Sequence, residues 1–142
     1  MMQERKIIID TNLWISFLLS KKFDFIDKLL DNGSLELVFC DELLTEFIDA
    51  ATRPKLQPFF TSDDWDLILE IIGQYAVYVS VKSSVTLCRD EKDNFLLSLA
   101  KDGKADYLLT GDNDLLVLKS FETTQIITIS EFQTLMQKPC IS

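Results

Sequence analysis

Short apolar runs alternate with segments of helical periodicity along most of this chain. Runs rich in branched and aromatic residues predict β-strands, at Lys6–Ile9, Leu35–Cys40, Ala76–Val81, Tyr107–Thr110 and Gln125–Ile129. Between them, apolar residues recur every three or four positions, which predicts helices. These are expected at Leu13–Leu19 and Phe23–Asp31, from Asp41 to just before Pro54, from Ser62 through Ile72, from Asp90 to Lys101, at Leu115–Leu118 and after Ser130.

The strand runs are solidly apolar, and most are followed by a helix. Strands that are buried on both faces have this pattern, as in parallel sheets with helices on either side. The chain shows no internal repeat, linker or low-complexity segment. The pattern therefore predicts one α/β domain over residues 1–142, a three-layer α/β/α sandwich with a central parallel sheet.

Polar and small residues at the predicted helix ends are expected to act as caps. Asp90 precedes one helix, which Gly103 is expected to end. Ser130 with Gln133 resembles a capping box for the last helix. The run Ser62-Asp63-Asp64 is expected to be a capped first turn without a chemical role.

Composition narrows the class of protein. The chain has 142 residues, of which 47% are hydrophobic, enough for a sizeable core. A net charge of −9 argues against a protein that coats nucleic acid, so a phosphate substrate would have to be bound locally. Three widely spaced cysteines without a CxxC pair favour a reducing cytoplasm. Since no apolar stretch approaches the roughly 20 residues of a membrane span, a soluble, untargeted protein is expected.

Carboxylates follow or flank the apolar runs, and the chain has no histidine. They are Asp10, Glu46, Asp93, Asp112 and Asp114. Without histidine, a Ser-His-Asp relay is excluded and a zinc site is disfavoured, whereas an all-oxygen ligand set suits Mg²⁺ or Mn²⁺. Ligands bind beyond the carboxyl ends of parallel strands, so Asp10 and Asp112, which directly follow two strands, are expected to meet there.

These carboxylates also have simpler structural explanations. Asp10 is placed to cap the following helix, a role compatible with binding a metal. Glu46 lies off the centre of the apolar stripe of its helix, as a solvated glutamate does. Asp93 falls in the first turn after Asp90, and Asp114 is placed to cap the short Leu115–Leu118 helix.

Two pairs of basic residues are weaker candidates: Arg53 and Lys55, on either side of Pro54, and Lys21-Lys22, expected in a loop. Either they are ordinary solvated charges, or they contact the phosphates of a nucleic acid near the acidic residues. The sequence leaves both explanations open.

Several motifs together resemble the PIN domain family, and more closely its bacterial VapC-like branch of toxins from toxin–antitoxin pairs. The resemblance covers about Ile7 to Phe132, nearly the whole chain. Its motifs are Ile7-Ile8-Ile9-Asp10-Thr11-Asn12, Glu42-Leu43-Leu44-Thr45-Glu46-Phe47, Arg53-Pro54-Lys55-Leu56, Arg89-Asp90 to Asp93-Asn94, Ala105-Asp106-Tyr107-Leu108-Leu109-Thr110-Gly111-Asp112 and Asp114-Leu115-Leu116.

The resemblance implies a metal-dependent endoribonuclease that cuts single-stranded RNA with Mg²⁺ or Mn²⁺. The residues that match the acidic tetrad of the family are Asp10, Glu46, Asp93 and Asp112, with Asp114 at an additional acidic position. Asn12 and Thr110 would orient these ligands. Cys40 stands where the family often has a small hydroxyl residue, so Asp41 is expected to cap the helix that carries Glu46. A small antitoxin protein is the expected partner, a homodimer is possible, and no membrane is involved.

Two other function classes share some of these features. A phospho-accepting receiver domain is also a small acidic α/β protein with Mg²⁺-binding aspartates, but it has a lysine just after a late strand. No lysine directly follows the run Tyr107–Thr110 or the run Gln125–Ile129. A non-catalytic interaction module would use the same acidic residues only to bind a basic partner.

Overall fold

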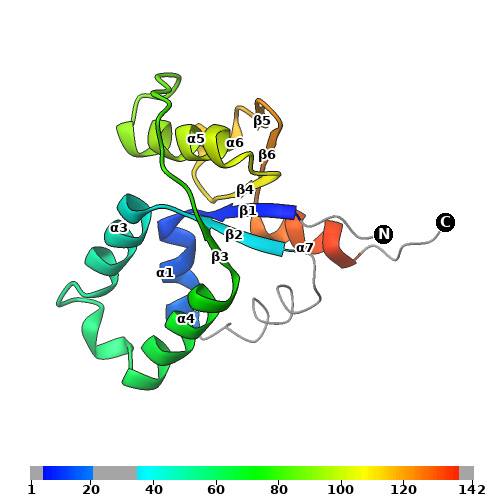
Figure 1. Cartoon of the computed structure of the whole chain (residues 1–142). Helices are drawn as coiled ribbons and strands as arrows, with labels where there is room; N and C mark the ends of the chain where they lie inside the picture. Colours follow the sequence, from blue (N-terminus) through cyan, green and yellow to red (C-terminus); the bar gives the residue numbers. More distant parts are fainter. Residues whose placement is uncertain (1–4, 21–34, 138–142) are drawn as a thin grey trace.

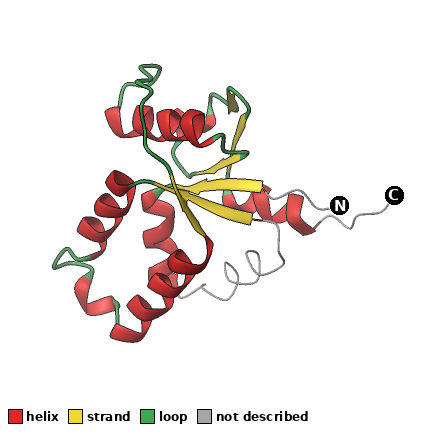
Figure 2. Ribbon diagram, in the orientation of Figure 1, coloured by secondary structure: helices red, strands yellow, loops and turns green. Residues whose placement is uncertain are grey.

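The computed structural model of the chain describes residues 5–20 and 35–137, and within these ranges it contains a six-stranded sheet. Figure 2 shows this sheet between helices. The strands are β1 (Arg5–Ile9), β2 (Leu35–Phe39), β3 (Ala76–Tyr78), β4 (Tyr107–Leu109), β5 (Ser120–Phe121) and β6 (Thr124–Ile127). Their order is β3-β2-β1-β4-β6-β5, and every pair is parallel except β5 with β6.

Helices lie on both sides of the sheet, which confirms the predicted three-layer α/β/α architecture. They are α1 (Thr11–Ser20), α3 (Asp41–Ala51), the short 3₁₀ helix η2 (Gln57–Phe59), α4 (Ser62–Tyr75), α5 (Glu91–Gly103), α6 (Asn113–Leu116) and α7 (Ile129–Gln137). In Figure 1, α1, α3 and α4 lie on one side of the sheet and α5 on the other. No helix in the described ranges is both long and apolar enough to span a bilayer. The helix predicted at Phe23–Asp31 falls outside these ranges.

All five predicted strands are present, although two differences from the sequence pattern are informative. The third ends at Tyr78 rather than Val81; the N–H of Val79 still donates to the carbonyl of Phe39 on β2, and the N–H groups of Lys82 and Ser83 then donate to the Asp102 carboxylate on α5. The antiparallel strand β5 was not predicted, since two residues are too short to give a periodic pattern.

An aromatic cluster packs α1 and α3 against one face of the sheet. The ring of Trp14 on α1 lies 6.1 Å from that of Phe39 on β2 and 5.9 Å from that of Phe47 on α3. Phe47 in turn lies 6.2 Å from Trp65 on α4. All three rings next to the sheet are buried. Since aromatic pairs stabilise beyond the area that they bury, this cluster fixes the two helices that carry residues of the predicted site.

The predicted first turn of α4 is confirmed, whereas the predicted capping box of α7 is wrong. Ser62, Asp63 and Asp64 form the first turn of α4, which Thr61 caps in a capping box with Asp64. Before α7 the box is formed by Thr128 with Glu131, not by Ser130 with Gln133. In both helices the hydroxyl of a threonine directly before the helix accepts the third helical N–H.

The helix α5 begins after Asp90 and ends at Gly103, as predicted, but Gly103 is not the left-handed residue. Asp90 is the N-cap and accepts a hydrogen bond from the N–H of Lys92. At the other end, Lys104 and not Gly103 adopts the left-handed conformation, with φ of 52°. Gly103 has a packing role instead, since a Cβ there would lie 2.8 Å from Cγ1 of the buried Val38 on β2.

We therefore predict that Gly103→Ala destabilises the protein by about 1–3 kcal/mol, because a buried β-branched side chain has little room to move. Gly73→Ala in α4 is the matched control, since a Cβ there meets nothing within 4 Å. It should stabilise the protein by about 0.5–1 kcal/mol. Urea unfolding followed by circular dichroism measures both, and a Gly103→Ala protein as stable as the wild type would contradict the packing role.

Candidate metal centre

The pairing of β1 with β4 brings Asp10 next to Thr110, although they are 100 residues apart in sequence. Ile9 pairs with Leu109, and the N–H of Asp10 donates to the carbonyl of Leu109 at 3.0 Å. The Thr110 hydroxyl donates to Oδ2 of Asp10 at 2.7 Å, and Oδ1 of Asp10 accepts the N–H of Asn12 at 3.2 Å. Asp10 is therefore both the cap of α1 and a buried carboxylate with a fixed orientation.

The same threonine positions the start of α6. Its oxygen accepts the N–H of Asp112 at 3.0 Å, so one hydroxyl connects the carboxyl ends of two neighbouring strands. Asp112 is the N-cap of α6, with Oδ1 accepting the N–H of Asp114 at 2.9 Å. The expectation that Asp114 caps this helix is wrong, because Asp114 lies in its first turn. The carboxylate of Asp114 instead contacts the Arg89 guanidinium at 3.1 and 3.2 Å.

Polar side chains at four-residue spacing on α5 hold the preceding segment against this helix. Asn94 accepts the N–H of Cys88 at 2.7 Å and donates to the Cys88 carbonyl at 3.0 Å. One turn further, Oγ of Ser98 accepts the N–H of Val85 at 3.0 Å. Together with the Asp102 contacts, these bonds fix the N-terminal end of α5, where Asp93 lies.

Asp93 is a buried carboxylate with one oxygen that accepts no hydrogen bond from the described residues. Its side chain is 5% exposed, and within the part of the chain that the structure describes its Oδ2 atom has no hydrogen-bond partner. Burial, followed by interaction with Asp112 and by the charges of Asp90 and Asp10, raises the pKa of Asp93 to about 7. A buried unpaired carboxylate is costly, so this atom needs a proton or a cation.

Glu46 reaches the same region from α3. Its neighbour Phe47 packs in the aromatic cluster, while Glu46 is half-buried and its Oε1 lies 4.0 Å from Nζ of Lys92. The N-cap of α3 is Cys40, which makes no side-chain capping bond, so the expected cap by Asp41 is not formed. Asp41 lies instead in the first helical turn, beyond the N-cap position from which a side chain can cap.

Four of the predicted acidic residues line one small cavity of about 90 Å³. These are Asp10, Glu46, Asp93 and Asp112, together with Thr11, Asn12, Asp90, Lys92 and Leu96. Asp114 lies at its margin, since one oxygen from each of Asp93, Asp112 and Asp114 lies within 4.8 Å of the other two. The fold thus gathers all five carboxylates that the sequence singled out.

The donor set fits a hard divalent cation. The acidic groups that line the cavity offer carboxylate oxygens, and its described lining has no imidazole or thiolate, which matches the preference of Mg²⁺ and Mn²⁺. The unpartnered Oδ2 of Asp93 is the observation that favours this fit, since a dication would compensate a buried charge that nothing else among the described residues compensates. Asp10, Asp93 and Asp112 would hold such an ion.

Two cations near this cavity were not predicted. Lys92 and Arg89 contact Glu46 and Asp114, respectively. In the sequence they appear only as ordinary charges next to Asp90 and Asp93. Their partners come from other elements, so only the assembled fold brings them to the site.

Comparison with known proteins agrees with this geometry. A PIN domain model matches residues 6–114. The chain belongs to the PIN domain family. PIN domains are generally metal-dependent nucleases, usually ribonucleases that bind Mg²⁺ or Mn²⁺. No solved structure matches the chain.

A curated relative is the uncharacterized protein MJ1680 of Methanocaldococcus jannaschii. It is 30% identical over 118 residues, which cover 80% of this chain and 75% of the relative. This similarity to an archaeal protein supports the family, and it assigns no specific activity.

The strand order separates this PIN domain from a receiver domain. Receiver domains have the strand order 2-1-3-4-5, and their topological switch point lies between the first and third strands. Here β1 lies between β2 and β4, and β3 is at the edge. The receiver explanation is therefore excluded by topology as well as by the missing lysine.

The raised pKa of Asp93 predicts how the stability of the metal-free PIN domain depends on pH. A folded-state pKa of about 7 lies above the unfolded value of ~3.9. The contribution of Asp93 to stability is therefore fully present below pH ~3.9 and is lost as the pH rises through 7. In EDTA, Asp93→Asn should remove this loss and be more stable than the wild type at pH 8, by on the order of 1–3 kcal/mol.

Thermal melts in EDTA at pH 5.5 and pH 8 measure this difference. Added Mn²⁺ should then raise the melting temperature of the wild type more than that of Asp93→Asn, since the cation binds the folded state. If the stability of both proteins depended on pH in the same way, Asp93 would not be part of the acidic cluster.

Proposed function

We propose that this PIN domain is a Mg²⁺- or Mn²⁺-dependent endoribonuclease that hydrolyses phosphodiester bonds in single-stranded RNA. The observation that carries the proposal is the gathering of Asp10, Glu46, Asp93 and Asp112 around one cavity at the carboxyl ends of β1 and β4. Membership of a family of metal-dependent nucleases supports the same conclusion.

Each carboxylate has a role that follows from its setting. Asp10 and Asp112 are direct metal ligands, since both are held at the strand ends by Thr110. Glu46 and Asp93 complete the site directly or through water, and Asp114 is an additional ligand once it is released from Arg89. Asn12 and Thr110 orient Asp10 through the two hydrogen bonds that it accepts.

When bound, Mg²⁺ or Mn²⁺ supplies charge stabilisation for the reacting phosphate and makes a retained water more acidic. The residues of the chain provide the rest. The side chains around the cavity hold the carboxylates in place before substrate arrives, so that little reorganisation is needed during the reaction. Burial of Asp10 and Asp93 reduces the water around them, which strengthens their interactions with a cation.

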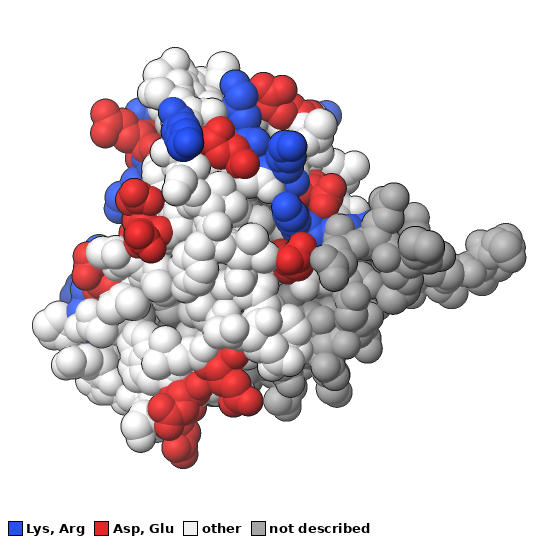
Figure 3. Space-filling view, viewed as in Figure 1, with Lys and Arg blue, Asp and Glu red and all other residues white. Residues whose placement is uncertain are grey.

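The RNA backbone must approach an acidic protein. On the face shown in Figure 3, Lys and Arg side chains are mixed with acidic ones in the upper part, and acidic side chains gather at the lower edge. Arg53 lines a cleft of about 490 Å³ beside Glu46 and Lys92, and Lys55 is exposed in the turn that follows α3. We assign phosphate contacts to Arg53 and Lys55.

The resemblance of the motifs to VapC-like proteins extends the proposal to a biological role. Under this extended proposal, the protein is the toxin of a toxin–antitoxin pair and acts in the cytoplasm. Its partner is a small antitoxin protein, and a homodimer is a possible assembly. Induced expression should then stop growth, and an Asp10→Asn protein at the same level should not. Unaffected growth with an active nuclease would restrict the proposal to an RNase without a toxin role.

We predict that RNA cleavage depends on Mg²⁺ or Mn²⁺ and on the acidic cavity. Asp10→Asn and Asp112→Asn should each reduce cleavage of a labelled single-stranded RNA to the level of wild-type protein in EDTA, because each removes a charged ligand. Gel analysis of the products as a function of time measures the rate.

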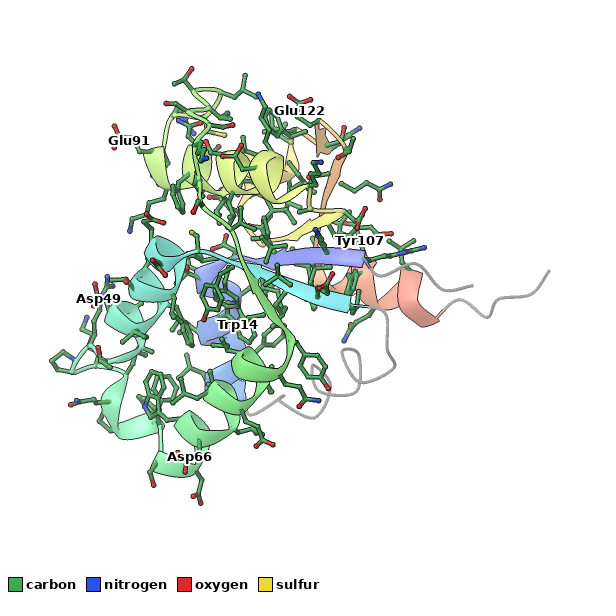
Figure 4. All side chains as sticks on the ribbon, viewed as in Figure 1. Trp14, Asp49, Asp66, Glu91, Tyr107 and Glu122 are labelled. Atoms are coloured by element: carbon green, nitrogen blue, oxygen red, sulfur yellow. The ribbon has the colours of Figure 1, made fainter. Side chains whose placement is uncertain are left out.

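Asp66→Asn is the matched control, since Asp66 is exposed on α4 and does not line the cavity; in Figure 4 it lies at the bottom of the view, whereas Glu91 on α5 lies near the top. It should cleave as the wild type does. Cleavage by EDTA-treated protein at the metal-loaded rate would rule out the metal mechanism, whereas no cleavage with either metal would favour the acidic surface as a non-catalytic interaction module.

A further prediction concerns Arg53 and Lys55. Each phosphate contact adds about 0.9 or less to the slope of log K against log salt, so replacing both residues by Ala should weaken RNA binding and reduce this slope by about 1–2. Fluorescence anisotropy at several salt concentrations measures the slope. Unchanged values would make both residues ordinary solvated charges.

A further inference from the structure

Lys92 lies where the acidic cavity meets the cleft along α3. Among the residues that line the acidic cavity in the described part of the chain, it is the one cation. It also lines the 490 Å³ cleft with Glu46 and Arg53, and an open hollow of about 620 Å³ with Arg89 and Asp114. In Figure 4, Glu91, which precedes Lys92 on α5, and Asp49 on α3 lie on the same side of the molecule.

The ammonium group of Lys92 is held only weakly. It lies 4.0 Å from Oε1 of Glu46, and its side chain is 68% exposed. Exposed ion pairs of this kind contribute little, because solvent screens them and two flexible side chains must be ordered. A cation bound to Glu46 would compete with Lys92 for the same oxygen, so the loaded site would leave the ammonium group available to an anion.

Arg89 is more firmly engaged than Lys92. Its guanidinium contacts both carboxylate oxygens of Asp114, at 3.1 and 3.2 Å. Both contacts come from one guanidinium nitrogen, and each is shorter than the 4.0 Å contact of Lys92. A substrate phosphate that binds Lys92 therefore displaces a weaker ion pair than one that binds Arg89.

The charge around the α3 cleft makes each cation important. Four carboxylates line it, from Asp41, Glu42, Glu46 and Asp49, against only two cations, Arg53 and Lys92. A nucleic-acid strand that passes through the cleft therefore meets a repulsive field, except next to these two groups. Arg53 lies beyond the end of α3, whereas Lys92 lies at the acidic cavity itself.

We propose that Lys92 binds the RNA phosphate next to the one being cut, at the point where the strand leaves the acidic cavity for the α3 cleft. This inference rests on the proposed RNase function and adds a substrate-binding residue to it. Lys92 thereby sets the path of the strand from the carboxylates towards Arg53. Because it contacts a neighbouring phosphate and not the reacting one, its contribution is to substrate binding rather than to the chemical step.

The test compares Lys92→Met and Lys92→Arg with Lys101→Met. Lys101 is the matched control, because it lies on the same helix, also forms a long ion pair, 3.9 Å from Glu122, and is half-exposed, but it lies in the last turn of α5. With metal-loaded full chain and a labelled single-stranded RNA, Lys92→Met should raise KM about tenfold with little change in kcat. Lys92→Arg should restore most of the binding, and Lys101→Met should match the wild type.

Two further measurements separate this role from a structural one. The salt slope of RNA binding should fall by about 1 in Lys92→Met only. Titration with Mn²⁺ alone should give an affinity for Lys92→Met equal to or higher than that of the wild type, because the competitor for Glu46 is gone. A weaker Mn²⁺ affinity would instead mean that Lys92 supports the metal site.

The failures are distinguishable. If the wild type cuts RNA but Lys92→Met has the KM and the salt slope of Lys101→Met, the inference is wrong and the RNase remains. A loss confined to kcat would also overturn it. If the wild type cuts no RNA with either metal, the proposed function fails, and this role of Lys92 fails with it.

Discussion

The structure of the candidate site depends on the register of β1 against β4. Because Ile9 pairs with Leu109, the next residues on each strand, Asp10 and Thr110, lie side by side at the edge where both strands end. The Thr110 hydroxyl donates to Asp10 and accepts from the backbone of Asp112, so one side chain connects the two strand ends. A shift of one residue would turn these groups to the opposite face of the sheet and separate the carboxylates.

This arrangement stores electrostatic repulsion that the remainder of the fold has to offset. Burial, followed by the proximity of Asp112, raises the pKa of the Asp93 carboxyl. The aromatic cluster around Trp14 and the side-chain bonds along α5 hold the contributing helices despite the repulsion. Such a site lowers the stability of the metal-free protein, but its ligands are already in place when the metal binds. This combination is common at functional sites.

The sequence was informative where chemistry follows local pattern. Solid apolar runs predicted the five strands, and the absence of histidine restricted the site to oxygen ligands. The motifs also pointed to Thr110 as a residue that orients the acidic ligands, as its bond to Asp10 does. Other contacts between distant elements had no such signal. The ion pairs of Lys92 and Arg89 and the close packing of Gly103 on Val38 depend on tertiary structure. The capping box before α7 was misplaced by two residues, because neighbouring hydroxyl and acidic residues offer similar local patterns.

The most direct test of the central claim is to locate the metal. Crystals of the full chain grown or soaked with Mn²⁺ would give an anomalous difference map in which the ion is identified by its own scattering. The account predicts a peak in the acidic cavity, within coordination distance of Asp10, Asp93 or Asp112, and no such peak for an Asp10→Asn, Asp112→Asn protein. Mn²⁺ bound only elsewhere on the acidic surface, or an empty cavity at saturating Mn²⁺, would contradict the claim that the paired strand ends build a metal site.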